Sequence, residues 1–228
     1  MLARVLEPEV MDTEEEARDY DAMDHGDVNR AFARDFFLFA AATAPPERIL
    51  DVGTGTALIA LELCRQSAEV HVTGVDLAAH MLAVARENVR RSEVASRIAL
   101  TLVDAKSLPF GDRTFDAVLC NSILHHIPEP AVAVREMLRV TARALFVRDL
   151  LRPESEAELR QLVVLHGGTP RDETHRRQVL LLEASLRAAL TLDEVRAAVA
   201  PMGIPGDAVQ RTSDRHFTLS HVVPDPGP

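Results

Sequence analysis

Two acidic residues and a pair of glycines occur at a spacing that could hold a small ligand. Asp51 precedes the turn Gly53-Thr54-Gly55, which lies where an apolar run gives way to a helical pattern. The glycines allow a tight turn and let the backbone approach a ligand, with free N–H groups at the start of the helix facing it. Asp76 ends the next apolar run, where an acid suits two hydrogen bonds from a ribose diol. This spacing predicts a nucleotide-like ligand.

Asp51 and a further acid, Asp104, indicate which nucleotide is bound. Asp51 lies two residues before Gly53, where the pyrophosphate of NAD would meet an unfavourable negative charge. A ligand with a cationic amino acid part would instead be attracted. Asp104 ends a third apolar run and could accept a hydrogen bond from an exocyclic amine such as that of adenine. A nicotinamide-dependent oxidoreductase remains the alternative that uses the same geometry.

Alternating strand and helix patterns must position these residues. Apolar runs predict strands at 48–53, 71–77, 97–105, 115–122 and 143–150, and helical periodicity lies between them at 56–65, 78–91 and 130–140. Strands separated by helical crossovers predict an α/β fold, with a doubly wound, Rossmann-like, mostly parallel sheet and helices on both faces. The carboxyl ends of its strands would gather the acids at one edge.

The N-terminal part of the chain precedes this pattern. A helical segment is expected from about residue 14 to residue 43, on which Phe32, Phe36 and Phe39 share one face. That face would pack on the body of the domain, and the helix could also cover a bound ligand. We therefore expect a helical cover over residues 1–46 and an α/β domain over 47–228, forming a single domain overall.

Helices and a hairpin are expected after the fifth strand. One helix should span 155–166 and end at two glycines, a second should open at Thr169-Pro170, and a third should follow a capping box at Thr191. The runs 208–213 and 216–223 predict an antiparallel hairpin. The helical insertion 154–190 is interpreted as a wall of the acceptor pocket, with a solvated arginine-rich face as the alternative.

The composition of the 228-residue chain excludes several function classes. Hydrophobic residues make up 47%, which excludes global disorder, and the formal charge of −10 is a poor footprint for nucleic acid or an anionic membrane. Two cysteines, Cys64 and Cys120, are too few for a disulfide framework. Glu7 and Glu9 interrupt the first residues before an apolar segment forms, so no signal peptide is expected. The sequence predicts a soluble cytoplasmic protein with a small-molecule partner.

Four runs together resemble one enzyme family. They are Asp51-Val-Gly-Thr-Gly-Thr-Ala57; Gly74-Val-Asp-Leu77 followed by Met81; Asp104-Ala105 with Leu108-Pro-Phe110; and Phe115-Asp-Ala-Val-Leu-Cys-Asn-Ser122 leading into Leu124-His-His-Ile127. The chain resembles the class I S-adenosylmethionine-dependent methyltransferases over residues 47–150, most of all the small-molecule group that includes ubiquinone and menaquinone biosynthesis methyltransferases. Two departures are Ala57, where the family often has a third glycine, and Val140-Thr-Ala-Arg143, which replaces a Lys-Pro-Gly-Gly turn.

The resemblance implies that S-adenosylmethionine is bound at the glycine turn. Gly53 and Gly55 would pass under the methionyl part, with Thr54 among the cofactor-binding residues. Asp51 would hold the ammonium group of the cofactor, directly or through water. Asp76 would take the ribose hydroxyls.

The resemblance also implies an adenine site and a residue near the sulfonium. Leu77 and Met81 would lie against the adenine, Asp104 would bind its amine and Ala105 its ring edge. Asn121 would contribute its carbonyl near the sulfonium. The implied activity is methyl transfer to a small-molecule acceptor, with a non-catalytic nucleoside-binding subunit as a further alternative.

Two adjacent histidines are the candidate catalytic residues. His125 and His126 follow the fourth strand, at the mouth expected for the acceptor pocket, and either could act as a general base. The alternative is that one hydrogen-bonds structurally while the other lies at the surface. A metal site would need further ligands at the right distance, and none is expected. Tyr20, the only tyrosine, is assigned equally to closing the cofactor site and to plain packing.

Overall fold

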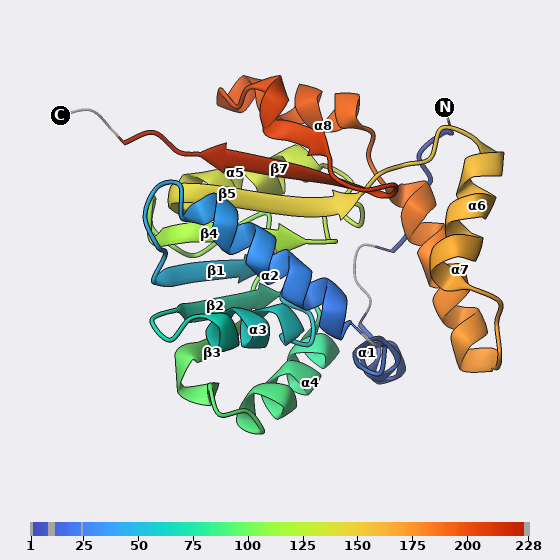
Figure 1. Ribbon diagram of the computed structural model, residues 1–228, viewed down its shortest axis with the longest axis horizontal. Helices are drawn as coiled ribbons and strands as arrows, with labels where there is room; N and C mark the ends of the chain where they lie inside the picture. The colour runs from blue at the N-terminus through green and yellow to red at the C-terminus, as the bar shows by residue number, and fades with distance from the viewer. Residues whose placement is uncertain (1, 9–11, 24, 226–228) are drawn as a thin grey trace. The chain divides into compact units, whose positions relative to one another are not determined.

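A computed structural model describes residues 2–8, 12–23 and 25–225 of the chain (Figure 1). Its strands form a seven-stranded sheet with the order β3-β2-β1-β4-β5-β7-β6. The strands are β1 (Arg48–Val52), β2 (His71–Asp76), β3 (Ile98–Leu102), β4 (Phe115–Asn121), β5 (Thr141–Leu150), β6 (Val209–Arg211) and β7 (His216–Val222). The predicted α/β fold class is confirmed.

Strand pairing brings the candidate site residues to one edge of the sheet. β1 pairs in parallel with both β2 and β4, with Val52 opposite Val75 and Cys120, and β3 extends the parallel part beyond β2. Asp76 and Asn121 are therefore the last residues of the two parallel strands that flank β1, at their carboxyl ends. β6 and β7 are antiparallel, which confirms the predicted hairpin.

The chain divides into two compact units. The first, here called the glycine-turn unit, comprises Val10–Asn121, Val132–Val147 and Ser220–Pro228. The second, the histidine unit, comprises Met1–Glu9, Ser122–Ala131 and Arg148–Leu219.

The N-terminal helical segment is two helices where the sequence predicted one. They are α1 (Glu14–Asp21) and α2 (Gly26–Ala40). A capping box between Thr13 and Glu16 starts α1, and the second helix begins anew at Gly26, a residue that disfavours a helix interior. α1 packs on α4 (Ala79–Arg90), whereas α2 packs on α3 (Leu58–Gln66), so a break between them follows from their different neighbours.

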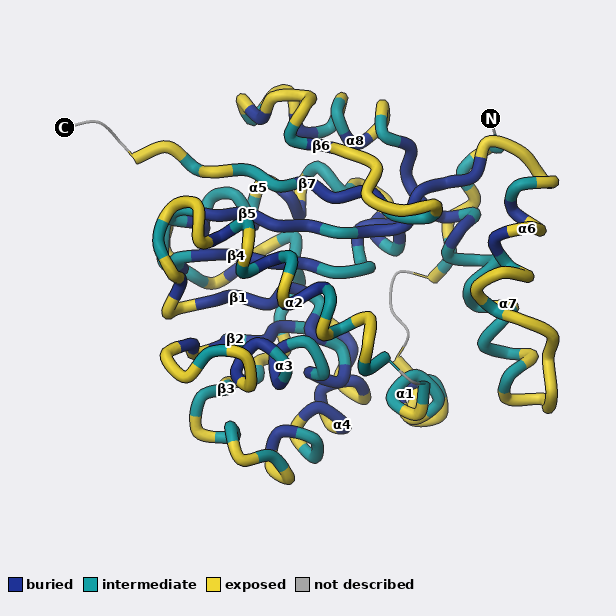
Figure 2. The backbone as a smooth tube through the Cα atoms, viewed as in Figure 1, coloured by how far each residue is buried: buried dark blue, intermediate teal, exposed yellow. Residues whose placement is uncertain are grey.

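The shared face of the phenylalanines in α2 is confirmed. Phe32 and Phe36 are buried, and the rings of Phe32, Phe36 and Phe39 each lie 5.5–5.9 Å from the ring of Phe146 on β5. These aromatic contacts join the helix to the core of the glycine-turn unit, which also takes Ile49 and Leu119 from neighbouring strands. Figure 2 shows β1 and β4 as mostly buried strands.

The fifth strand starts two residues earlier than predicted. α5 (Pro130–Val140) ends directly before Thr141, the first residue of β5, without an intervening glycine turn. The Thr141 hydroxyl donates to the Met137 carbonyl at 2.6 Å, which satisfies one of the last carbonyls of the helix. The replacement of the family's usual turn is therefore accommodated by a direct helix-to-strand junction.

Three helices follow β5 in the histidine unit: α6 (Glu156–Gly167), α7 (Glu173–Ala188) and α8 (Leu192–Val199). Gly168, at φ 69°, ends α6, and the Thr191–Glu194 capping box starts α8, as predicted. The predicted start of α7 at Thr169-Pro170 is wrong. Asp172 caps this helix instead, because its carboxylate accepts from the His175 N–H at 2.8 Å, and aspartate is a stronger N-cap than threonine. No helix within the described ranges combines the length and apolar character that a membrane crossing requires.

Candidate cofactor and acid–base sites

Three residues of the glycine turn that follows β1 adopt left-handed backbone conformations. Gly53 and Gly55 have φ values of 75° and 54°, and Ala57 has a φ of 65°. The N–H groups of Gly53 and Thr54 both donate to the Val75 carbonyl, at 2.8 and 3.0 Å, which ties the turn to the end of β2. Ala57 thus keeps the left-handed conformation that a glycine adopts most readily, at a cost of about 1 kcal/mol. The substitution of the family's third glycine leaves the turn intact. A residue outside the turn, Ser122 in the histidine unit, also has a positive φ, of 57°.

The carboxylate of Asp76, the last residue of β2, links the end of that strand to the glycine turn after β1. One carboxylate oxygen accepts from the Gly55 N–H at 2.8 Å, and the other accepts from the Ala78 N–H at 2.9 Å. Burial raises the pKa of Asp76, although these backbone donors act in the opposite direction. A carboxylate has about four lone-pair positions. Each oxygen therefore keeps capacity to accept a hydroxyl of a ribose while it orders the turn.

Asp51 is a buried acid with a single hydrogen-bond donor. It is 1% exposed, and the Thr54 hydroxyl donates to it at 2.7 Å. Burial raises the pKa of Asp51 to about 7, the Thr54 hydrogen bond lowers it, and the negative charge of Asp76 raises it further. No cation among the described residues figures in that balance. A ligand that brings a positive charge would therefore be drawn to this carboxylate.

Tyr20 of α1 lies beside the same turn. A Cβ atom placed on Gly55 would come 3.9 Å from the Cε1 atom of Tyr20. The ring also packs with Ala78 and Met81 at the start of α4. Burial, together with the charges of Asp51 and Asp76, raises the pKa of Tyr20 to about 12. Tyr20 therefore packs on α4 and lies beside the glycine turn, and its role in closing the cofactor site stays a prediction.

The remaining predicted cofactor residues lie on the neighbouring segments of the glycine-turn unit. Met81 is buried in α4, and Leu77, between β2 and α4, is 39% exposed. Asp104 follows β3, where its carboxylate accepts from the Lys106 N–H at 2.8 Å and lies 3.2 Å from the Lys106 ammonium. Ala105 is half-buried beside it, and Asn121 is the half-buried last residue of β4.

Sequence reasoning did not foresee that Asp104 has a cation of its own. Lys106, two residues on, forms the ion pair, whereas Asp51 has no such partner in the part of the chain that the structure describes. The lysine was visible in the sequence, in the run Asp104-Ala-Lys106. A carboxylate and an ammonium two residues apart in a loop can form an ion pair, so this spacing could have predicted the contact.

The histidine unit holds both candidate catalytic residues. His125 is 3% exposed, and its Nδ1 atom lies 2.5 Å from a carboxylate oxygen of Asp149 on β5. Burial alone would lower the pKa of His125, but Asp149 and then Glu7 outweigh it and raise the pKa. Although burial acts to raise the pKa of Asp149, the same contact with His125 lowers it. Asp149 also accepts from the Leu124 N–H at 2.6 Å, which holds the loop after β4 in place.

His126 has a different environment from its neighbour. The two rings lie 4.2 Å apart, and burial followed by the charge of His125 lowers the pKa of His126 to about 4. Its Nδ1 atom is buried and has no hydrogen-bond partner among the described residues. Sequence reasoning missed Asp149 and Glu7. A lone acid inside the apolar run of residues 143–150 was a usable signal for Asp149, but nothing in the sequence placed Glu7 beside the histidines.

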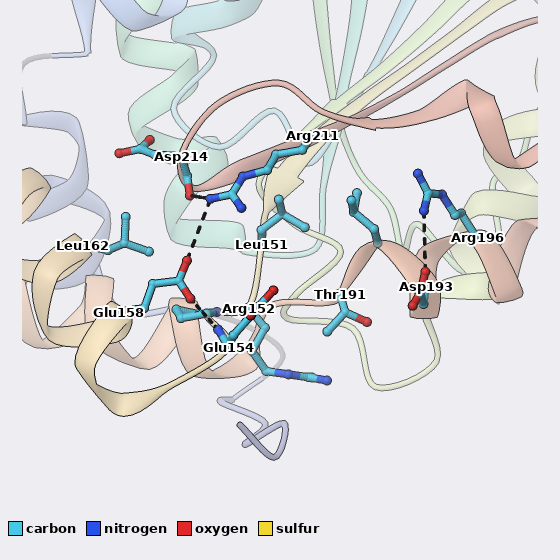
Figure 3. Close-up of a pocket in the computed structure, with 12 residues that line it drawn as sticks. Leu151, Arg152, Glu154, Glu158, Leu162, Thr191, Asp193, Arg196, Arg211 and Asp214 are labelled. Atoms are coloured by element: carbon cyan, nitrogen blue, oxygen red, sulfur yellow. Dashed lines mark hydrogen bonds and ion pairs between the residues drawn. The ribbon is translucent and has the colours of Figure 1, made fainter. Parts of the chain in front are cut away.

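A separate small cavity lies in the histidine unit (Figure 3). Its volume is about 190 Å³, and the insertion supplies Glu154, Glu158 and Leu162 to its wall. Arg211 lies 3.9 Å from Glu158, and Arg196 lies 3.5 Å from Asp193, so the charged side chains around it are paired with each other. Ligand pockets of small molecules are usually larger, at about 300–1,000 Å³. The cavity therefore gives no independent support for an acceptor site.

Comparison with known proteins identifies the family. Residues 50–144 match a family model described as a methyltransferase domain. The demethylmenaquinone methyltransferase of Porphyromonas gingivalis is 37% identical over 113 residues, which cover 48% of this chain and 46% of that protein. The tRNA1(Val) (adenine(37)-N6)-methyltransferase of Vibrio vulnificus is 30% identical over 175 residues, which cover 65% of this chain and 72% of that protein. The chain spans about half the length of the first curated relatives it matches.

Solved structures share the fold across most of the chain. A SAM-dependent methyltransferase from Aquifex aeolicus superposes with a TM-score of 0.65 at 17% identity, over 92% of this chain and 98% of that one. The plantazolicin methyltransferase BpumL, in a complex that contains SAH, gives a TM-score of 0.68 at 13% identity, over 91% of this chain and 90% of that one. These findings exclude the nicotinamide-dependent alternative. The chain belongs to the class I S-adenosylmethionine-dependent methyltransferases, enzymes that share this sheet, this glycine turn and this cofactor.

Proposed function

We propose that the enzyme transfers the methyl group of S-adenosylmethionine to a small-molecule acceptor. The observation that carries the cofactor part of the proposal is the carboxylate of Asp51 beside the glycine turn, where burial raises its pKa to about 7. S-adenosylmethionine brings an ammonium and a sulfonium, and a cation beside Asp51 would relieve the cost of burying its charge. The open face of Gly55, where an added Cβ would meet only Tyr20 at ordinary contact distance, also suits the close approach of a ligand.

We assign cofactor contacts to the residues around this turn. Asp51 holds the ammonium group, and the backbone of Gly53, Thr54 and Gly55 passes under the methionyl part. Asp76 accepts the ribose hydroxyls through the lone pairs left by its two backbone donors. The bound cofactor supplies an electrophilic methyl group on a positively charged sulfur.

The adenine contacts are assigned to the segments after β2 and β3. Leu77 and Met81 lie against the adenine ring, and Ala105 meets its edge. Asp104 accepts from the exocyclic amine through the oxygen that Lys106 does not occupy. Asn121, at the end of β4, offers its carbonyl to the sulfonium region.

Of the two histidines, His125 is the better candidate for a general base. The Asp149 carboxylate orients its ring and favours its protonated form, so His125 can take a proton from an acidic acceptor. His126, with a pKa of about 4, is too weak a base for this step near neutral pH. Proximity and alignment of the acceptor with the methyl group supply the rest of the catalysis.

A small acceptor is favoured over a nucleic acid by the charge of the chain. The net charge of −10 opposes binding to a polyanion, although one relative is named as a tRNA methyltransferase. We interpret the helical insertion 154–190 as a wall of the acceptor pocket, and we place the activity in the cytoplasm. Relatives are also named as acting on demethylmenaquinone and phosphatidylethanolamine, so apolar and amphipathic acceptors belong in the first panel.

The test is a methyl-transfer assay with labelled S-adenosylmethionine against quinols, phenols, amines, carboxylic acids and bulk tRNA. The proposal predicts label in a small-molecule acceptor and none in tRNA. Label in tRNA alone would contradict it. With the active acceptor, His125→Ala should lower kcat by about 10²–10⁴ at unchanged cofactor affinity, and unchanged kcat would remove the base assignment.

A further inference from the structure

Three potential metal ligands converge in the histidine unit. One ligand atom from each of Glu7, His125 and His126 lies within 4.8 Å of the other two. The same oxygen of Glu7, Oε1, is 3.5 Å from His125 Nε2 and 3.2 Å from His126 Nδ1. The sequence predicted no metal site because it offered only the adjacent histidines. Glu7, far away along the chain, supplies the third ligand.

The separations fit four-coordinate zinc. Zinc binds histidine nitrogens and carboxylate oxygens at about 2.0–2.2 Å, so neighbouring ligands of a tetrahedral ion lie about 3.4 Å apart. The two distances to Glu7 fall on either side of that value. Two histidines and one glutamate are also the donor set of one class of catalytic zinc site, which keeps its fourth position open.

The nitrogen atoms that face Glu7 are suited to act as ligands. His126 Nδ1 is buried and lacks a hydrogen-bond partner among the described residues. His125 uses its Nδ1 atom for Asp149, which leaves Nε2 to face Glu7. A carboxylate on the far nitrogen of a ligand histidine is a common support in metal sites, because it fixes the ring and strengthens the ligand.

Glu7 is held in place by its own segment. The Ser185 hydroxyl donates to Glu7 Oε1 at 3.1 Å, and the Val5 N–H donates to the Arg187 carbonyl at 3.1 Å. The Arg4 guanidinium donates to the His125 carbonyl at 3.1 Å and to the Ile127 carbonyl at 3.0 Å. These contacts fasten residues 4–7 to the loop that carries the histidines and to the end of α7.

We propose that Glu7, His125 and His126 form a binding site for a zinc-type divalent transition metal, with Asp149 as the supporting carboxylate of His125. With Nδ1 engaged by Asp149, His125 offers the lone pair of Nε2, and binding forms a metal–nitrogen bond with that electron pair. The fourth position remains for water. While the metal is bound, His125 cannot act as a base, so the site does not rest on the proposed methyl-transfer chemistry.

The test measures metal binding to the full chain without a polyhistidine tag, after treatment with a chelator and in the absence of cofactor and acceptor. Calorimetric titration with Zn²⁺ should show one ion per chain. Titration with Co²⁺ should give the visible absorption of a four-coordinate ion. Absence of stoichiometric binding by both metals would overturn the proposal.

Variants separate this site from adventitious binding. Glu7→Gln and His126→Ala should each lower the affinity at least tenfold, and Asp149→Asn should lower it about 10–100-fold. His71→Ala, an exposed histidine at the start of β2, is the matched control and should bind as the parent does. Zinc should raise the Tm of the parent and of His71→Ala but not that of Glu7→Gln. Equal zinc affinity in Glu7→Gln, His126→Ala and the parent would also overturn the proposal.

Discussion

The two units each bury a carboxylate, and they treat its charge in opposite ways. In the glycine-turn unit, Asp51 has no cationic partner among the described residues, and burial raises its pKa to about 7. In the histidine unit, Asp149 lies 2.5 Å from His125, and the pair lowers the pKa of Asp149 while it raises that of His125. The fold itself neutralises the charge of Asp149, whereas Asp51 is left able to accept a positive charge from a ligand, which is the role that we propose for it.

The same difference sets opposite dependences of stability on pH. The folded pKa of Asp51 lies above its unfolded value, so folding favours the protonated acid, and that stability is lost as pH rises from about 4 to about 7. The folded pKa of Asp149 lies below its unfolded value, so its stabilisation is lost as pH falls through the folded pKa. His125, with a raised pKa, loses its contribution as pH rises through its folded value.

The largest change in stability is expected at Asp149, whose charge is neutralised by His125. Asp149→Asn removes one partner of a buried ion pair and should lower the free energy of unfolding by about 3–5 kcal/mol near pH 6. Chemical denaturation of the parent and the variant measures the loss. Asp207→Asn, at an exposed aspartate, is the control. A loss below about 1 kcal/mol would show that the pair does not neutralise Asp149.

Removing the charge of Asp51 should instead raise the free energy of unfolding. Asp51→Asn keeps an acceptor for the Thr54 hydroxyl but removes the buried charge, and it should stabilise the cofactor-free protein at pH 8 by at most about 4 kcal/mol. At pH 4, where Asp51 is protonated, the gain should vanish. Denaturation curves at both pH values measure it. A variant that is less stable than the parent at pH 8 would mean that Asp51 already has a compensating partner.

Cofactor affinity should depend on the acid that orders the turn. Asp76→Ala removes a charged acceptor of hydrogen bonds worth about 1.5–3 kcal/mol, so the Kd of S-adenosylmethionine should rise roughly tenfold to a hundredfold. Asp76→Asn, which keeps one acceptor oxygen, tests whether loss of the Gly55 contact alone explains the effect. Calorimetry on folded variants with the parent's affinity would remove the ribose assignment.

A smaller effect is expected at Asp104, because Lys106 already satisfies part of its charge. Asp104→Ala should raise the Kd of S-adenosylmethionine by about tenfold or less, and it should reduce the preference for the cofactor over an analogue without the exocyclic amine. Competition binding with both ligands measures that preference. A preference as strong as the parent's would leave Asp104 without a role in adenine recognition.

Sequence patterns predicted the parts of the fold that depend on local periodicity. Patterns within about ten residues predicted the strands β1 to β5, the closing hairpin, the Thr191 capping box and the glycine turn. The break between α1 and α2 and the start of α7 were missed, because tertiary neighbours and a competing Asp172 cap decided them. The neutralisation of Asp149 depends on a histidine from another strand end, and the approach of Glu7 depends on distant segments. These charged groups are brought together only by the fold, so local sequence patterns could not predict their pairing.

We propose that the carboxylate of Asp51 binds the positive charge of the cofactor. Calorimetric titration with S-adenosylmethionine at pH 6, in buffers of different ionisation enthalpy, measures the protons released on binding. The free protein holds Asp51 mostly protonated at that pH, and a bound cation would ionise it, so about 0.9 proton should leave per cofactor bound. At pH 8, and in Asp51→Asn at pH 6, the release should approach zero. Binding without proton release by the parent at pH 6 would contradict the account.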